Sequence, residues 1–86
     1  MSDLNQQFLD AVASSKSMSS RPDNETMLNV SALYKQGTQG DAPSVGPRDM
    51  MGMFKHKAWA RLLGLPQEDA QRKYVELVNS LLAARA

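Results

Sequence analysis

The stretch from residue 27 to residue 41, MLNVSALYKQGTQGD, decides the fold that this sequence predicts. Its apolar side chains recur every three or four residues, at Met27, Val30 and Tyr34, which is the spacing of an amphipathic helix. Leu28 and Leu33 flank this stripe. We expect the helix to open near Pro22–Asp23, because proline is tolerated in a first turn, and to end at Gly37 and Gly40.

Three further segments have helical spacing, and no segment alternates as a half-buried strand would. They cover residues 2–14, 49–63 and 66–86. Ser2 is the expected N-cap of the first, the serine-rich run from Ser14 is expected to end it, and Gly64 is expected to stop the third. The third helix is expected to bury one side, which is made of Met50, Phe54, Ala58 and Leu62. A loop with three glycines and two prolines, residues 37–48, precedes it. These elements predict an all-α fold, a four-helix bundle in a single domain over residues 1–86.

The composition narrows the class of protein. The chain has 86 residues, no cysteine and a net charge of +1, so disulfides and thiolate metal sites are excluded. The basic excess typical of a nucleic-acid-binding domain is missing. No apolar run reaches the length of a membrane span, and the first residues, MSDLNQQF, lack the features of a signal peptide. We therefore expect a cytoplasmic monomer with no nucleic-acid partner and no stable membrane insertion.

No catalytic set is recognisable, so we do not expect an enzyme. His56 is the only histidine, and no carboxylate stands at ligand spacing to it on one helix, which favours a surface histidine over a metal site. No serine lies in a nucleophile-elbow pattern. The cluster of Met50, Met51 and Met53 has two interpretations, because methionine fills irregular gaps in a core and also lines pockets for flexible apolar ligands.

The residues around Tyr34 point to a ligand site. Ser31 precedes Tyr34 by three positions and Lys35 by four, so all three share one side of a helix. Lys55 is the first cation of the third predicted helix, and Tyr74 lies on the inner stripe of the fourth. The plainer interpretation of Tyr34 and Lys35 is a core tyrosine beside a solvated lysine. Together, however, these residues would suit an anion beside an apolar cleft.

The sequence resembles the acyl-CoA-binding protein family over nearly its whole length. The most specific match is to the family pattern M-L…Y-K-Q-A-T-x-G-D, and it consists of Met27–Leu28 followed by Tyr34-Lys35-Gln36-Gly37-Thr38-Gln39-Gly40-Asp41. Further matches reinforce it: Lys55, Ala58–Trp59, Gly64, Glu68-Asp69-Ala70 and Tyr74. The resemblance implies an up-down-down-up bundle of four helices. It also implies non-covalent binding of medium- to long-chain fatty acyl-CoA by an intracellular carrier that needs no cofactor.

The resemblance implies a role for individual residues as well. The residues that match Tyr34, Lys35 and Lys55 hold the 3′-phosphate and adenine end of coenzyme A in the family. The residue that matches Lys16 lies near the phosphates, and the one that matches Tyr74 contacts the ligand. The acyl chain would lie in an apolar groove near the positions of Val12 and Met27, and Met51 is expected to line the same groove.

One departure from the family pattern affects the head group. The family usually has an aromatic residue at the position of Ser31, where it packs on the adenine, and serine cannot stack. Stacking of a base on an aromatic ring contributes ~1–3 kcal/mol, so we expect a weakened contact with the nucleotide. The alternative function is a helical module that holds a partner helix in its groove, which Ser31 and the methionine cluster motivate.

Overall fold

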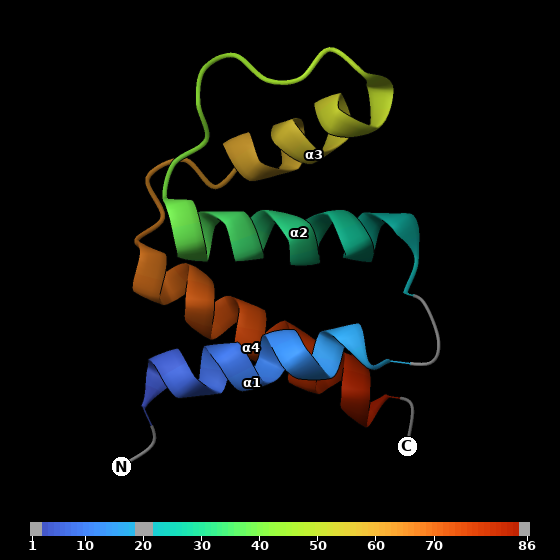
Figure 1. Ribbon diagram of the computed structural model, residues 1–86, viewed down its shortest axis with the longest axis vertical. Coiled ribbons are helices and arrows are strands. Elements are labelled where there is room, and N and C mark those ends of the chain that lie inside the picture. The colour runs from blue at the N-terminus through green and yellow to red at the C-terminus, as the bar shows by residue number, and fades with distance from the viewer. Residues whose placement is uncertain (1–2, 19–21, 85–86) are drawn as a thin grey trace.

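Aspartate side chains begin three of the four helices that the structure contains. The computed structural model describes residues 3–18 and 22–84, and within these ranges it has no strand. The helices are α1 (Leu4–Lys16), α2 (Asn24–Gln39), α3 (Met50–Ala60) and α4 (Gln67–Ala83). Helices α1 and α4 run in one direction and α2 and α3 in the other, as Figure 1 shows. The predicted all-α fold with up-down-down-up order is confirmed.

The caps explain where the helices begin. The carboxylates of Asp3, Asp23 and Asp49 each accept a hydrogen bond from a backbone N–H of the first turn, at 3.1, 2.7 and 2.9 Å respectively. Such bonds satisfy donors that have no partner inside the helix. The prediction that Ser2 caps the first helix is wrong, because Asp3 takes that position; Ser2 itself lies outside the described residues.

The ends of α1 and α2 differ from the prediction. Helix α1 passes Ser14 and continues to Lys16. The hydroxyl of Ser15 donates to the Val12 carbonyl at 2.8 Å, so this serine is accommodated within the helix instead of breaking it. Helix α2 passes Gly37 and ends at Gln39, and Gly40 caps it with a φ of 84°, a backbone conformation that favours glycine.

Gly37 does not end α2, as was expected, but has a role in packing. It is buried where α4 crosses α2, and its carbonyl accepts a 2.9 Å hydrogen bond from the side-chain amide of Gln71. A Cβ atom at this position would lie 3.0 Å from Cγ of Gln71. The glycine therefore allows the two helices to approach closely.

The last two helices are shorter than predicted. Helix α3 stops at Ala60, and residues 61–64 form a turn in which Leu62 and Leu63 donate to carbonyls three residues back, at 2.9 and 3.2 Å. Gly64 then has a φ of 88°, which matches its predicted role in reversing the chain. Helix α4 ends at Ala83, while residues 85–86 lie outside the described part.

Two apolar clusters hold the helices together. The first joins α1, α2 and α4 through Phe8, Ala11, Leu33, Tyr74 and Val78. The second joins α2 to α3 through Ala32, Ala58 and Trp59. The molecule measures 37 × 30 × 15 Å, so it is little thicker than one helix with its side chains, at ~10–12 Å. Both sides of the α2–α3 contact therefore face solvent.

The prediction of which side of the third helix is buried is wrong for the first half of that helix. Met50 and Phe54 are 74% and 51% exposed, whereas Ala58 and Trp59 are buried. Helix α3 contacts α2 and no other helix among the described residues, and that contact is close only at the C-terminal half, where small alanines meet. The N-terminal halves of the two helices leave a hollow between them instead.

A set of hydrogen bonds fastens the loop that lets α2 and α3 run in the same direction (Figure 1). The Asp41 carboxylate accepts from the buried Gln36 amide and from the Gly64 N–H, both at 2.9 Å. These two contacts hold the pKa of Asp41 below its usual value of 3.8, with the Gly64 bond as the larger cause. The indole N–H of Trp59 donates to the Gly40 carbonyl at 2.8 Å. The start of the loop is thus tied to α2, to α3 and to the turn that follows α3.

His56 also holds the loop in place. Its Nε2 lies 2.6 Å from the Pro43 carbonyl oxygen, which can only accept, so Nε2 carries the proton. The ring also lies against Gly46, where a Cβ atom would be 2.4 Å from its Cγ. His56 is therefore a partly exposed histidine on α3, as predicted, and it also holds the loop against that helix.

Candidate functional site

A groove runs along the α2–α3 contact on one side of the molecule. Its wider part is a hollow of about 480 Å³, within the size range of small-molecule sites. Seven residues line it: Asn24, Met27, Leu28, Ser31, Met51, Phe54 and Lys55. The structure thus brings together four residues that the sequence analysis named separately, namely Met27, Ser31, Met51 and Lys55.

The groove continues towards the loop as a smaller hollow of about 200 Å³. Lys35, Lys55, His56 and Trp59 line it, together with loop residues that include Pro43, Val45 and Pro47. Lys55 lines both hollows, so they are neighbours, and we call the two together the groove. The ammonium of Lys35 lies 5.4 Å from the centre of the Trp59 ring, which is within the range of a cation–π contact.

The charge of this groove is unbalanced. Its lining contains two lysines and no carboxylate. Over residues 3–18 and 22–84 the one ion pair joins Arg72 to Asp69, so neither Lys35 nor Lys55 is paired with an acidic side chain. Two like charges that share a hollow repel each other until an anion enters it. The loop end of the groove is therefore suited to a negatively charged group, and the wider end to an apolar one.

Tyr34 and Lys35 diverge, although they are adjacent in the sequence. Lys35 turns to the α3 side of α2, while the Tyr34 ring stacks on Phe8 of α1 with centroids 6.0 Å apart. Tyr34 remains 41% exposed. It lines neither hollow of the groove, so the expected pair is divided between two sides of α2.

Tyr74 lies beneath Tyr34 and is only 2% exposed. Its ring meets Phe8 edge-on at 5.1 Å and Tyr34 at 6.2 Å. Its hydroxyl lies 3.1 Å from the Ser15 hydroxyl. Burial raises the pKa of Tyr74, and the bond to Ser15 offsets part of that rise. Among the predicted site residues, Tyr74 is the most enclosed.

The two predicted residues of α1 lie apart from the groove. Val12 is half-buried and packs against the cluster of Phe8 and Tyr74. Lys16 is exposed in the last turn of α1. Neither lines the hollows between α2 and α3.

Phe54 and Trp59 are the site residues that the sequence analysis missed. Both were assigned to the core or its border, but Phe54 lines the wider hollow opposite Ser31, and Trp59 supports Lys35. One pattern could have indicated Phe54: a ring immediately precedes Lys55 in a sequence that lacks the usual aromatic residue at Ser31.

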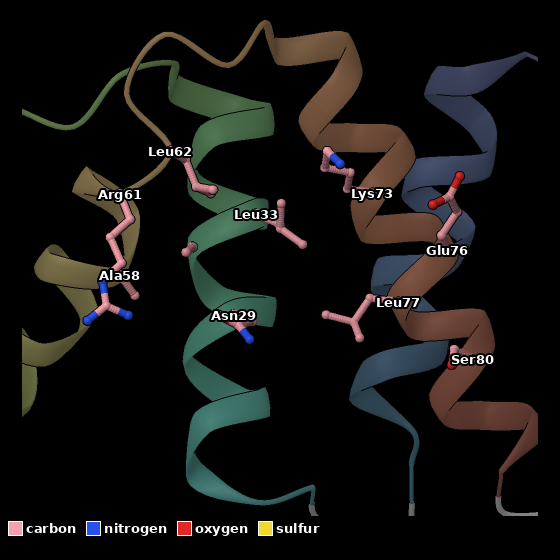
Figure 2. Close-up of a pocket in the computed structure, with 10 residues that line it drawn as sticks. Asn29, Leu33, Ala58, Arg61, Leu62, Lys73, Glu76, Leu77 and Ser80 are labelled. Carbon is pink, nitrogen blue, oxygen red and sulfur yellow. The ribbon is translucent and has the colours of Figure 1, made fainter.

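A further hollow, separate from the groove and of about 620 Å³, opens between α2, α4 and the end of α3. Figure 2 shows it, with Leu33 and Leu77 pointing into the space between α2 and α4. Charged side chains of both signs border it, namely Arg61, Lys73 and Glu76. It is larger than either hollow of the groove, but it contains none of the predicted ligand residues.

The described part of the chain lacks two other features. It holds no group of three or more His, Cys, Asp or Glu side chains that could bind a metal ion. None of its helices combines the length and the apolar character needed to cross a membrane.

Known proteins are similar to this chain in sequence and in fold. The family model for acyl CoA binding protein matches residues 5–78. Acyl-CoA-binding protein homolog 1 of Caenorhabditis elegans is 42% identical over 78 residues, which are 88% of this chain and 91% of that protein. Enoyl-CoA delta isomerase 2 of Rattus norvegicus is 41% identical over 78 residues, but these are only 20% of its length. The crystal structure of Oryza sativa acyl-CoA-binding protein 2 superposes with a TM-score of 0.84 at 27% identity, and the match covers 96% of this chain and 94% of that one. The chain belongs to the acyl-CoA-binding protein family.

Proposed function

We propose that this protein binds medium- to long-chain fatty acyl-CoA esters without covalent chemistry and carries them in the cytoplasm. The observation that supports this most directly is the division of the α2–α3 groove. One end holds two lysines without acidic partners, and the other end is lined by Met27, Leu28 and Met51. A ligand with a phosphorylated head and an apolar tail matches both ends.

Both ends can contribute to affinity. Each methylene that leaves water contributes about 0.8 kcal/mol, so a dozen buried methylenes would supply ~10 kcal/mol before the costs of association. A hydrogen bond to a charged group contributes ~1.5–3 kcal/mol. The acyl chain is therefore the larger source of affinity, and the lysines orient the ligand.

We assign the phosphate contacts to Lys35 and Lys55, and the acyl contacts to Met27 and Met51. Trp59 holds the Lys35 ammonium near the hollow, which lowers the entropy lost when a phosphate binds. Methionine suits the other end, because its unbranched side chain adapts to a flexible ligand.

We further propose that Phe54 takes the place of the aromatic residue that Ser31 lacks. Phe54 and Ser31 line the same hollow from opposite helices, and Lys55 follows Phe54 directly. A base that stacks on Phe54 would leave a neighbouring phosphate within the reach of Lys55. The adenine would then be recognised from α3 instead of α2.

The remaining predicted residues have lesser roles in this proposal. Tyr34 offers a partly exposed side chain and Lys16 an exposed cation, both outside the groove. Val12 and Tyr74 support Tyr34 from the core, which suits the burial of Tyr74 better than the direct ligand contact that the resemblance implies.

We propose no catalytic role. The match to the rat isomerase covers a fifth of that protein, so it supports no chemistry for this chain. We also propose that residues 1–86 form one binding domain that acts as a monomer.

Calorimetric titration tests the proposal. We expect palmitoyl-CoA to bind with a stoichiometry of one, more tightly than octanoyl-CoA, because each further buried methylene adds apolar contact. Free coenzyme A and palmitate serve as controls that each lack one half of the ligand, and both should bind weakly. No heat and no thermal shift with palmitoyl-CoA at micromolar protein would contradict the proposal.

A further inference from the structure

The outer side of α3 carries apolar side chains that nothing in the fold covers. Met50, Met53 and Phe54 are 74%, 55% and 51% exposed. They surround a shallow hollow of about 340 Å³, and Arg48 and Lys57 complete its lining. We call these five residues the α3 patch. Large apolar side chains that gather in this way on a surface mark an interaction site more often than single ones do.

The charge around the α3 patch is strongly one-sided. Residues 48–61 hold four of the ten basic side chains of the protein but only one of its nine acidic ones. That single acid, Asp49, is engaged as the N-cap of α3, where it accepts from the Gly52 N–H at 2.9 Å. The rest of the chain has a negative balance, although the net charge of the whole protein is +1. The patch therefore attracts negatively charged surfaces.

We propose that the α3 patch docks on the surface of lipid bilayers that contain anionic lipids. A bilayer surface offers both complementary features together, since anionic headgroups attract the cations and the acyl boundary accepts the methionine and phenylalanine side chains. Apolar side chains of such a helix enter the interface by about 5–10 Å, with the helix axis in the plane of the membrane.

The position of the groove favours a bilayer over an acidic protein as the partner. Phe54 lines both the α3 patch and the wider hollow of the groove. Docking would therefore bring the Phe54 edge of the wider hollow next to lipid. If the protein carries acyl chains, as proposed above, this geometry lets a chain pass between bilayer and groove with little exposure to water. The docking itself does not depend on that function.

The expected attachment is weak and reversible. Helix α3 has 11 residues, so it is ~16 Å long, and the α3 patch presents only three apolar side chains. An anionic surface attracts each nearby cation with a gain of about fivefold in partition. Attachment should therefore depend on both the methionines and the cations.

Flotation with phospholipid vesicles tests the docking. The full chain, free of ligand, is mixed with vesicles of phosphatidylcholine alone or with roughly one-third phosphatidylserine. We expect flotation with the anionic vesicles, and a loss of it when salt rises from about 0.1 M to about 0.5 M. Met50→Ser/Met53→Ser should lower the partition coefficient about tenfold or more, because both side chains leave the apolar boundary. Arg48→Ala/Lys57→Ala should lower it by about 30-fold.

Matched variants separate the patch from general surface effects. Leu9→Ser/Leu63→Ser removes two similarly exposed apolar side chains, and Arg72→Ala/Lys73→Ala removes two cations, in each case outside the α3 patch. Both should float like the unmodified protein. Palmitoyl-CoA binding by Met50→Ser/Met53→Ser is measured in parallel and should persist, so a failure of docking is distinguishable from a failure of the proposed function. Absence of flotation with either vesicle, or equal flotation of patch and control variants, would overturn the proposal and leave an acidic protein as the partner of the patch.

Discussion

Replacement of Phe54 by alanine tests the most specific part of the site. The ring is 51% exposed, so about half of its surface is still available to a ligand. A phenylalanine buries roughly 200 Å² when it is enclosed, and half of that area corresponds to ~100 Å² and to ~2.5 kcal/mol at ~25 cal/mol per Å². This value falls within the ~1–3 kcal/mol known for stacking of a base on an aromatic ring. We therefore expect Phe54→Ala to weaken palmitoyl-CoA binding by about 2 kcal/mol, or about 30-fold.

The assay must show that the loss concerns the adenine. Calorimetry with palmitoyl-CoA is compared with calorimetry on S-palmitoyl-pantetheine, which has the same acyl chain but no nucleotide. Phe54→Ala should weaken the first ligand and leave the second nearly unchanged. Leu9→Ala is a matched control, because Leu9 is also 51% exposed but lies on α1 and lines neither hollow of the groove.

A second variant tests the exchange of the ring between helices. Adding Ser31→Tyr to Phe54→Ala should restore much of the lost affinity, since the new ring would enter the same hollow from α2. Two results would refute this reasoning. Equal losses for both ligands would mean that Phe54 contacts the acyl chain, and no difference between Phe54→Ala and Leu9→Ala would remove it from the site.

Three further outcomes follow from the described contacts. Lys35→Ala should weaken palmitoyl-CoA binding by ~1.5–3 kcal/mol in calorimetry, while Lys57→Ala, which lies outside the groove, should not; equal affinities of the Lys35 variant and the unmodified protein would contradict a phosphate contact. Asp41→Asn should lower the melting temperature measured by circular dichroism at neutral pH, because Asp41 as a carboxylate accepts from the Gly64 N–H. The folded-state pKa of Asp41 is lowered, so this stabilisation is present above a pH of about 3.8 and lost as the pH falls through the folded pKa; a melting difference that persists undiminished in strong acid would argue against it. The pH dependence that Tyr74 causes has the opposite direction. Its folded-state pKa is raised, so the stability of the protein is retained below a pH of about 10 and lost as the pH rises further. In urea unfolding, Tyr74→Phe should therefore lose less stability at alkaline pH than the unmodified protein.

Much of the fold could be predicted, because the helices that cross the core carry a regular stripe. In α2 and α4 the residues expected on or beside the inner stripe include Leu33 and Tyr74, which are both buried. Helix α3 was harder, since Met50, Met51, Met53 and Phe54 place apolar side chains on nearly every side. Local spacing cannot show that a helix meets its neighbour along only half of its length. That outcome depends on where Ala32 and Ala58 allow close contact, which is a property of the folded chain.

The loop and the site show the same limit. Glycines and prolines predicted a loop, but the bonds of Asp41 to Gln36 and Gly64 join positions up to 23 residues apart, and no periodic pattern reports such contacts. Ser31 and Lys55 were named from their positions on the predicted helices, Met27 and Met51 with the family resemblance, and all four line one hollow. Phe54 was expected in the core and not in the groove, because the proposed replacement of an aromatic residue from another helix has no counterpart in the family pattern.

Helix α3 contacts only α2, and this has a consequence for how the molecule opens. Detaching α3 exposes Ala32, Ala58 and Trp59, but leaves the cluster of Phe8 and Val78 intact. Such a segment opens locally at a lower free energy than the whole domain needs to unfold. Amide hydrogens of α3 should therefore exchange with solvent faster than those of α4, and a ligand that bridges α2 and α3 should slow them selectively. Local opening of α3, which forms one wall of the groove, would then admit the ligand.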